Sequence, residues 1–318
     1  MTKLILAIFQ SPEGDRPLSA MALLLVGVFT LALQDATVKL IAPETSFWQF
    51  QTLRSIGNGL FIAAFASFSG NFNILVPKNW RPVYFRGMML STCMLCFFSG
   101  APLLSVSQMA SGLYTYPLFV SLLAVPILGE KVGPWRITAI IIGTLGAAIT
   151  LNPFDESFSS TQLLPIAAGF FYACNIIILR HSCRYESSLA LAMAVAVLFL
   201  CSGLAGIIFL TLFSVSNDIA VTLPFIAVGW PKLTMTVLVF AIFCSILNLS
   251  GNICLSRAYQ TADSSWLVPI DFSYLLFAAF WGWVIFNAWP PQNAVIGMTL
   301  IAIAGMLTAW REQQKQKS

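Results

Sequence analysis

Four charged side chains interrupt the apolar stretches of this sequence, and each of them needs a partner or contact with water. Asp35 and Lys39 lie in the first long stretch, Arg54 in the second, and Asp271 near the end of the chain. A charge at the centre of a membrane helix costs about 2.5 to 3.5 kcal/mol. Such residues persist where they are paired or face a polar path, so these four are the first candidates for a binding or coupling site.

Asp271 lies two residues after Pro269. Proline removes a backbone donor and loosens a helix, and an unwound turn beside a carboxylate suits a substrate or ion site within a membrane. Two interpretations are open. Asp271 is either a site for a substrate amine or a coupled proton, or a buried carboxylate that pairs with Arg or accepts a hydrogen bond from Tyr.

Asp35 and Lys39 are four residues apart, so on a helix they share a face and can neutralise each other. Arg54 enters from the next apolar stretch at a similar depth. Together they predict an outer vestibule that holds a carboxylate or another anion. The alternative is a structural ion cluster in which Lys39 extends to the membrane interface.

Aromatic and amide side chains add to the candidate path. The aromatic candidates, which could stack on a flat or cationic substrate, are Tyr114, Tyr116, Trp266 and Tyr274. Helix packing explains any single one of them as well. The amide candidates are Asn175, Asn248 and Asn252. Buried amides often bridge membrane helices for about 1 kcal/mol each, so a structural role is favoured over ligand binding for these.

The composition identifies an integral membrane protein. Of 318 residues, 58% are hydrophobic and 9% are charged, whereas soluble domains carry about 25% charged residues. One spanning helix needs about 20 apolar residues, and the long unbroken runs exclude a barrel. We therefore predict an all-α protein with ten membrane-spanning helices, at about 18–41, 46–69, 83–104, 107–128, 134–151, 161–180, 187–213, 233–256, 264–287 and 291–310.

The positive charges predict an orientation. With both termini inside, thirteen of the sixteen Lys and Arg residues fall at inner ends: Lys3, Arg16, Lys78, Arg81, Arg86, Lys131, Arg136, Arg180, Arg184, Arg257, Arg311, Lys315 and Lys317. Only Lys232 falls at an outer end. This asymmetry predicts a multi-pass protein of the inner membrane with cytoplasmic tails at 1–17 and 311–318.

The two halves of the chain echo each other. Gln108-x-Ala110 and Pro117 in the first half correspond to Gln260-x-Ala262 and Pro269 in the second, and Gly146 corresponds to Gly305. Because each unit, 18–152 and 161–310, has an odd number of spans, the second must insert upside down. Inverted repeats are typical of alternating-access transporters, with the site near the midplane.

Several motifs together resemble a known family. They are Asp35-Ala-x-x-Lys39, Leu113-Tyr-Thr-Tyr-Pro-Leu-Phe119, Leu128-Gly-Glu130, Pro269-Ile-Asp-Phe-Ser-Tyr274 and the spacing Gly297…Gly305. Over residues 18–310 the chain resembles the EamA-type branch of the drug/metabolite transporter superfamily. The resemblance implies a 5+5 inverted repeat around a central cavity that moves small metabolites without ATP. It also implies a cytoplasmic gate role for Glu130, although Ala288 stands where the family usually has a second Glu.

We therefore expect a secondary transporter of a small zwitterion, such as an amino acid, with export implied by the resemblance. Uptake of S-adenosylmethionine or a similar organic cation is the main alternative, and a passive channel or a non-transporting scaffold is the alternative from another class. The single histidine and the absence of Walker, HExxH and GxSxG motifs argue against an enzyme. We expect no cofactor, metal or nucleic acid. The expected partners are the lipid bilayer, a small-molecule substrate and, through Asp271, protons.

Overall fold

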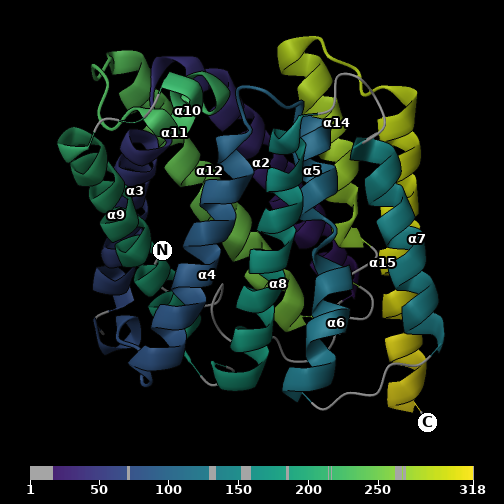
Figure 1. Cartoon of the computed structure of the whole chain (residues 1–318). Helices are drawn as coiled ribbons and strands as arrows, with labels where there is room; N and C mark the ends of the chain where they lie inside the picture. Colours follow the sequence, from purple (N-terminus) through teal and green to yellow (C-terminus); the bar gives the residue numbers. More distant parts are fainter. Residues whose placement is uncertain are drawn as a thin grey trace.

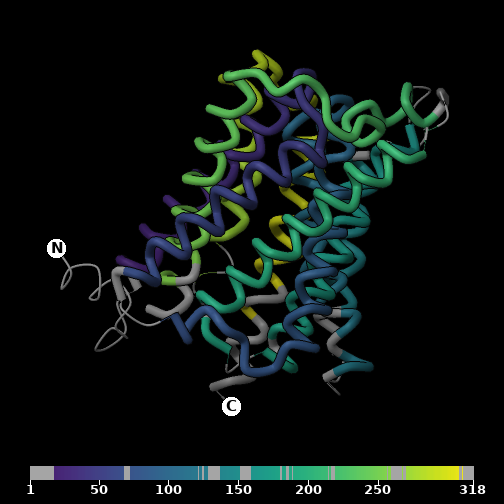
Figure 2. Tube along the Cα trace, turned by 90° about the vertical axis from the view of Figure 1, so that its left-hand side faces the viewer, coloured from purple at the N-terminus to yellow at the C-terminus, as the bar shows by residue number. Residues whose placement is uncertain are grey.

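The fold was examined in a computed structural model, which describes residues 17–69, 72–128, 134–151, 159–183, 186–213, 215, 217–261, 267 and 270–317. The described residues form helices and turns, with no strand among them. The helices run in roughly similar directions and pack side by side in one bundle (Figures 1 and 2).

The principal helices fall on the ranges predicted from hydropathy. They are α2 Pro17–Ile41, α3 Phe47–Ser69, α4 Trp80–Ser99, α5 Val106–Leu113, α6 Tyr116–Leu128, α7 Pro134–Leu151, α8 Leu164–Ser182, α9 Ser188–Leu212, α12 Met235–Thr261, α14 Ser273–Phe286 and α15 Gln292–Lys317. Short turns of helix occur at η1 Ala42–Glu44, η2 Phe72–Leu75, η3 Ser160–Leu163, α10 Asn217–Thr222 and α11 Pro224–Ala227.

Five of the described helices are long and apolar enough to cross a membrane: Leu18–Glu44, Val106–Ile127, Ser160–Leu179, Leu189–Leu212 and Met235–Leu255. Shorter apolar helices lie at Ile137–Thr150, Ser273–Phe286 and Gln292–Leu307. The all-helical membrane class is thus confirmed, while the count of ten crossings remains a prediction.

Helix α4 begins at Trp80, three residues before the predicted start. The Glu186 carboxylate accepts hydrogen bonds from the backbone N–H groups of Lys78 (2.9 Å) and Asn79 (2.8 Å), just before the helix begins. A carboxylate at a helix N-terminus satisfies amides that have no partner within the helix. The residue that stabilises this start comes from the connection between α8 and α9, far along the sequence.

The predicted span 107–128 is not one continuous helix, because it breaks at Tyr114 and Thr115 between α5 and α6. Pro117 has no N–H to donate, and its ring would clash with the carbonyl four residues earlier. That carbonyl belongs to Leu113. The neighbouring Gly112 carbonyl accepts hydrogen bonds from Thr115, whose N and Oγ1 lie 3.2 Å and 2.7 Å from it. A second break occurs at Phe272, immediately before α14.

The helices pack in pairs that correspond between the two halves of the chain. Helix α2 packs along α12, as α8 packs along α4, and α3 packs on α12, as α9 packs on α4. Helix α14 packs on α2, as α6 packs on α8. The pairs α3–α9 and α7–α15 each join corresponding helices directly.

Much of the outer surface is apolar, as a protein surrounded by lipid requires. Large exposed hydrophobic residues occur on many helices, for example Ile208 and Phe209 on α9 and Ile242 and Phe243 on α12. Figure 1 places α10 and α11 at the upper end of the bundle and the C-terminal end of α15 at the lower end. Figure 2 shows α2 and α3 beside α12 on one side of the molecule.

Helices α7 and α15 approach closely because glycines face each other at their crossing. A Cβ atom at Gly146 would lie 2.8 Å from the Gly297 carbonyl oxygen, and one at Gly297 would lie 2.5 Å from that of Gly146. Small residues allow membrane helices such close contact. Gly305, the position that corresponds to Gly146 in the second half of the sequence, packs against the ring of Phe272.

We predict that Gly297→Ala destabilises the protein, because the new methyl group would collide with Thr150 and the Gly146 carbonyl. Overpacking of this kind costs about 1–3 kcal/mol. The matched control is Gly59→Ala in α3, where nothing lies within 4 Å of the added Cβ. Thermal unfolding in detergent should show a lower melting temperature for the first variant and an equal or higher one for the control. Equal melting temperatures for both variants would contradict the packing described here.

Candidate functional site

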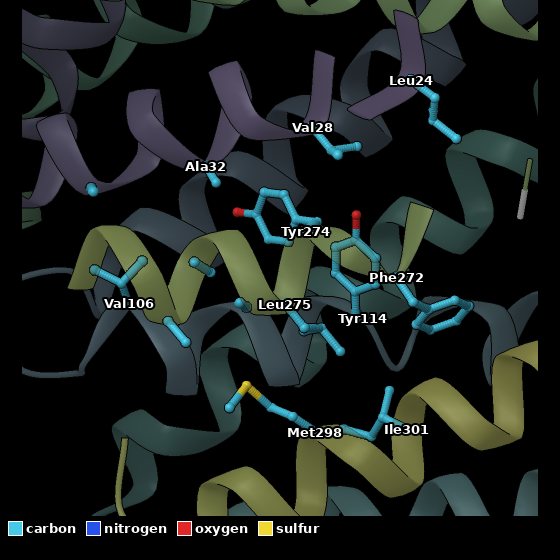
Figure 3. Close-up of a cluster of buried hydrophobic side chains, with 14 of the residues drawn as sticks. Leu24, Val28, Ala32, Val106, Tyr114, Phe272, Tyr274, Leu275, Met298 and Ile301 are labelled. Carbon is cyan, nitrogen blue, oxygen red and sulfur yellow. The ribbon is translucent and has the colours of Figure 1, made fainter. Parts of the chain in front are cut away.

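Two tyrosines stack face to face where the two helix breaks meet. The rings of Tyr114, at the break between α5 and α6, and Tyr274, in the first turn of α14, lie 4.8 Å apart and are inclined by 10°. Figure 3 shows them between α2 on one side and Met298 and Ile301 of α15 on the other. Both tyrosines are buried, so their hydroxyl groups must find partners inside the bundle.

Asp271 lies at this junction with only 8% of its surface exposed. The Tyr116 hydroxyl donates a hydrogen bond to its Oδ2 at 3.1 Å, and the Tyr114 hydroxyl donates to its backbone carbonyl at 3.2 Å. Side chains of the α5–α6 region thus satisfy both the carboxylate and the carbonyl of the Asp271 segment. The geometry matches the second interpretation drawn from the sequence, a buried carboxylate bonded by tyrosine.

Asp35 of α2 lies on the other side of the tyrosine stack. Its carboxylate accepts hydrogen bonds from the Tyr274 hydroxyl and, at 2.8 Å, from Nε2 of Gln34. The chain of bonds continues into α12 and α3. Asn248 donates to Oε1 of Gln34 at 2.7 Å, and Asn58 donates to Oδ1 of Asn248 at 3.2 Å.

These contacts join buried and half-buried residues of both halves into one line, which we call the polar belt. Its members are Tyr116, Asp271, Tyr114, Tyr274, Asp35, Gln34, Asn248 and Asn58. In a low-dielectric interior, polar groups that bond one another are strongly held in place, although Oδ1 of Asn58 at the end of the belt has no partner among the described residues. The belt crosses the bundle from α6 to α3.

Arg54 lies beside the polar belt, with 2% of its surface exposed. Its Nη2 donates to Oε1 of Gln51 at 2.6 Å, and its Cζ lies 5.6 Å from the centroid of the Phe98 ring. Asp35 attracts it electrostatically. No hydrogen-bond acceptor among the described residues lies at its Nε or Nη1.

Lys39 corrects the pairing predicted from its spacing with Asp35. Its Nζ donates to the carbonyls of Ala101 and Leu104, both at 2.7 Å, and lies 5.3 Å from the centroid of the Phe286 ring. These carbonyls follow the end of α4, where they have no partner within a helix. Asp35 finds its donors in Gln34 and Tyr274, so the two charges have separate partners.

The other predicted residues divide among three situations. Asn252 is exposed, and its amide donates to the Asn248 carbonyl of its own helix, so it lies outside the polar belt. Asn175 of α8 is buried, and its Oδ1 has no partner among the described residues. Trp266 and Glu130 lie outside the described residues.

The sequence reasoning missed three members or neighbours of the site. Gln51 and Asn58 flank Arg54 in α3 at a spacing of three and four residues, so the three side chains share one helix face. That polar stripe in an apolar helix was a readable signal. Tyr172 of α8, which packs edge-on against Tyr116 at 5.0 Å, carried no comparable signal.

The arrangement offers carboxylates at Asp35 and Asp271, a cation at Arg54 and aromatic surfaces between them. A separate cavity of about 190 Å³ lies between α4, α6 and α8 and is lined by residues such as Phe85, Met89 and Ile177. That cavity is almost wholly apolar and shares no residue with the polar belt. Among the described residues, the belt and Arg54 are therefore the candidate functional site, and the apolar cavity is not.

Known proteins were compared with the chain. Residues 18–152 match the EamA-like transporter family. A riboflavin transporter of Vibrio cholerae is 28% identical over 207 residues, which cover 64% of this chain and 63% of that protein, just under two thirds of its length. A riboflavin transporter of Rhizobium johnstonii is 24% identical, with 94% of this chain and 91% of that protein covered.

Two further matches cover nearly the whole chain. An S-adenosylmethionine uptake transporter of Rickettsia bellii is 23% identical, with 91% of this chain and 94% of that protein covered. A protein of known crystal structure, 18% identical, superposes with a TM-score of 0.56 over 92% of this chain and 96% of its own, which shows a likeness of fold. The apolar helices and the named transporters to which the chain is similar indicate a multi-pass membrane protein, and its first half resembles the EamA-like transporter family.

Proposed function

We propose that the chain is a secondary transporter that carries a small zwitterionic metabolite across the inner membrane by alternating access. The observation that carries this proposal is the polar belt with Arg54, which places two carboxylates and a guanidinium inside an otherwise apolar bundle. Charges buried within membrane helices mark substrate and ion paths. The relatives named as transporters support the same class of function.

The proposal includes two inverted five-helix units, at 18–152 and 161–310, with both tails cytoplasmic. The corresponding helix pairs support it, because α2–α12 and α4–α8 exchange places when the two halves are exchanged. The site of such a carrier is expected between the units, near the midplane. The polar belt joins residues of both units, as that location requires.

A zwitterion with a ring fits the belt better than a purely apolar compound. The carboxylates of the belt can attract the positive charge of an amine or sulfonium group, and Arg54 can attract the negative charge of a carboxylate. S-adenosylmethionine, the compound in the names of several relatives, has both kinds of charge and a flat base. Riboflavin, in the names of others, has a flat ring but no such pair of charges.

The function is tested by counterflow in proteoliposomes that contain the purified full chain. Radiolabelled amino acids, S-adenosylmethionine and riboflavin are each offered outside vesicles loaded with the same unlabelled compound. A carrier gives saturable, transient accumulation of its substrate. Non-saturable flux would indicate a channel, and no flux of any zwitterion with strong flux of riboflavin would overturn the zwitterion proposal.

We predict that Asp271→Asn uncouples transport from a proton gradient. The amide keeps an acceptor for the Tyr116 hydroxyl but cannot exchange a proton with the transport path. Accumulation driven by a proton gradient should fall by about tenfold, on the scale of typical coupling energies of about 1–3 kcal/mol, while counterflow persists. Glu44→Gln, which neutralises an exposed carboxylate in η1, is the control and should keep both activities. Proton-driven accumulation that survives in the Asp271 variant would rule out coupling through this residue.

A further inference from the structure

Arg54 is a buried cation whose surroundings do not neutralise it. It is 2% exposed, and its guanidinium makes one hydrogen bond among the described residues, from Nη2 to the neutral amide oxygen of Gln51. The other two guanidinium nitrogens, Nε and Nη1, have no acceptor among the described residues. Arginine stays protonated in proteins, so the positive charge cannot be removed by loss of a proton.

The nearby carboxylate does not fill this gap. Asp35 attracts Arg54 electrostatically, but its oxygens accept hydrogen bonds from Tyr274 and Gln34. Two further contacts of Arg54 are with neutral groups. The Phe98 ring lies against the guanidinium, and the Ser245 hydroxyl donates a hydrogen bond to the backbone carbonyl of Arg54. A buried charge without a hydrogen-bonded counter-ion is strongly unfavourable.

A second donor without a partner lies next to Arg54. Gln51, one turn earlier in α3, is 1% exposed, and its Nε2 has no acceptor among the described residues. The orientation of this amide is fixed by Arg54, because the opposite orientation would direct the Gln51 NH₂ group at the guanidinium. Arg54 and Gln51 together therefore present N–H donors from two side chains and one positive charge.

We infer that Arg54 and Gln51 form the subsite for a carboxylate group of the transported substrate. This inference rests on the proposed function and specifies which part of the substrate meets which part of the site. The guanidinium of Arg54 matches the single negative charge of a carboxylate, and the N–H groups of Arg54 and Gln51 can donate to its oxygens. Hydrogen bonds between charged groups are stronger than those between neutral groups. The cationic part of the zwitterion then faces the carboxylates of the polar belt.

In the absence of substrate, the buried charge of Arg54 should lower the stability of the folded protein, and this effect can be measured. Replacing an uncompensated buried charge with a neutral side chain of similar length removes the unfavourable term. We therefore expect Arg54→Gln to raise the melting temperature of the ligand-free protein, although it removes a buried hydrogen bond to Gln51. A purely structural arginine would give the opposite result, a lower melting temperature.

The test uses formate as a carboxylate probe with the purified full chain in detergent. Melting temperature is measured during a sodium formate titration for the wild type, Arg54→Gln, Arg54→Lys and the control Arg81→Gln, which removes a charge from an exposed position. A ligand that binds only the folded state raises its melting temperature. Formate should stabilise the wild type and the control by a few degrees more than Arg54→Gln, and Arg54→Lys, which keeps the charge alone, should show an intermediate response.

The outcomes separate this inference from the proposed function. Equal formate responses in the wild type and Arg54→Gln would overturn the subsite, as would a lower melting temperature or failure to fold of Arg54→Gln without formate. If the subsite is overturned while counterflow of a zwitterion persists, the transport proposal stands without it. If formate stabilises the wild type through Arg54 but no zwitterion shows counterflow, the anion site stands and the transport proposal fails.

Discussion

The structure depends on one constraint, which is that a polar group inside an apolar bundle must be bonded by another part of the protein. A continuous helix satisfies its own backbone, but a broken helix leaves carbonyl and amide groups without partners. Two such breaks lie within the described residues, at Tyr114–Thr115 and at Phe272, and they face each other. The hydroxyl of Thr115 donates to the Gly112 carbonyl, and the hydroxyl of Tyr114 donates to the Asp271 carbonyl. The side chains that make the breaks tolerable are thus the ones that bring polar groups to the centre.

The same constraint explains how the charges are distributed. Lys39 donates to two carbonyls after α4, while Asp35 accepts from Gln34 and Tyr274, so both charges are stabilised by neutral dipoles and not by each other. Dipoles that surround a charge hold it without cancelling it. Asp35 and Arg54 attract each other electrostatically, but the hydrogen bonds of each go to neutral groups. An arrangement of this kind leaves each charge available to a ligand.

Part of this structure could be predicted from the sequence because it depends on local properties. Helix positions follow from the lengths of the apolar runs. Asp271 was selected as a candidate site residue because it is an isolated charge close to Pro269. The partners of Lys39 could not be predicted, since they are backbone carbonyls more than sixty residues away that carry no side-chain signal. The early start of α4 had the same cause, because Glu186 lies 107 residues beyond Asn79. Arg54 was recognised, but its lack of a bonded counter-ion is a property of packing that no spacing reveals.

Contacts between the halves at the two ends of the bundle bear on how a carrier of the proposed type would open. At the end that holds α10 and α11, Trp48 and Gln49 of α3 donate to the carbonyls of Ile226 and Pro231 at 2.8 Å each. At the other end, Glu186 bonds the amides that precede α4. Both sets of bonds are present together, and Asp271 and Arg54 are both buried. In alternating access one set must break while the other holds, and each set consists of a few hydrogen bonds worth about 0.5–1.5 kcal/mol apiece, or more to a charged group. Differences of that size fall within the range that the binding energy of a small substrate can reverse, so the site between the halves can control which end opens.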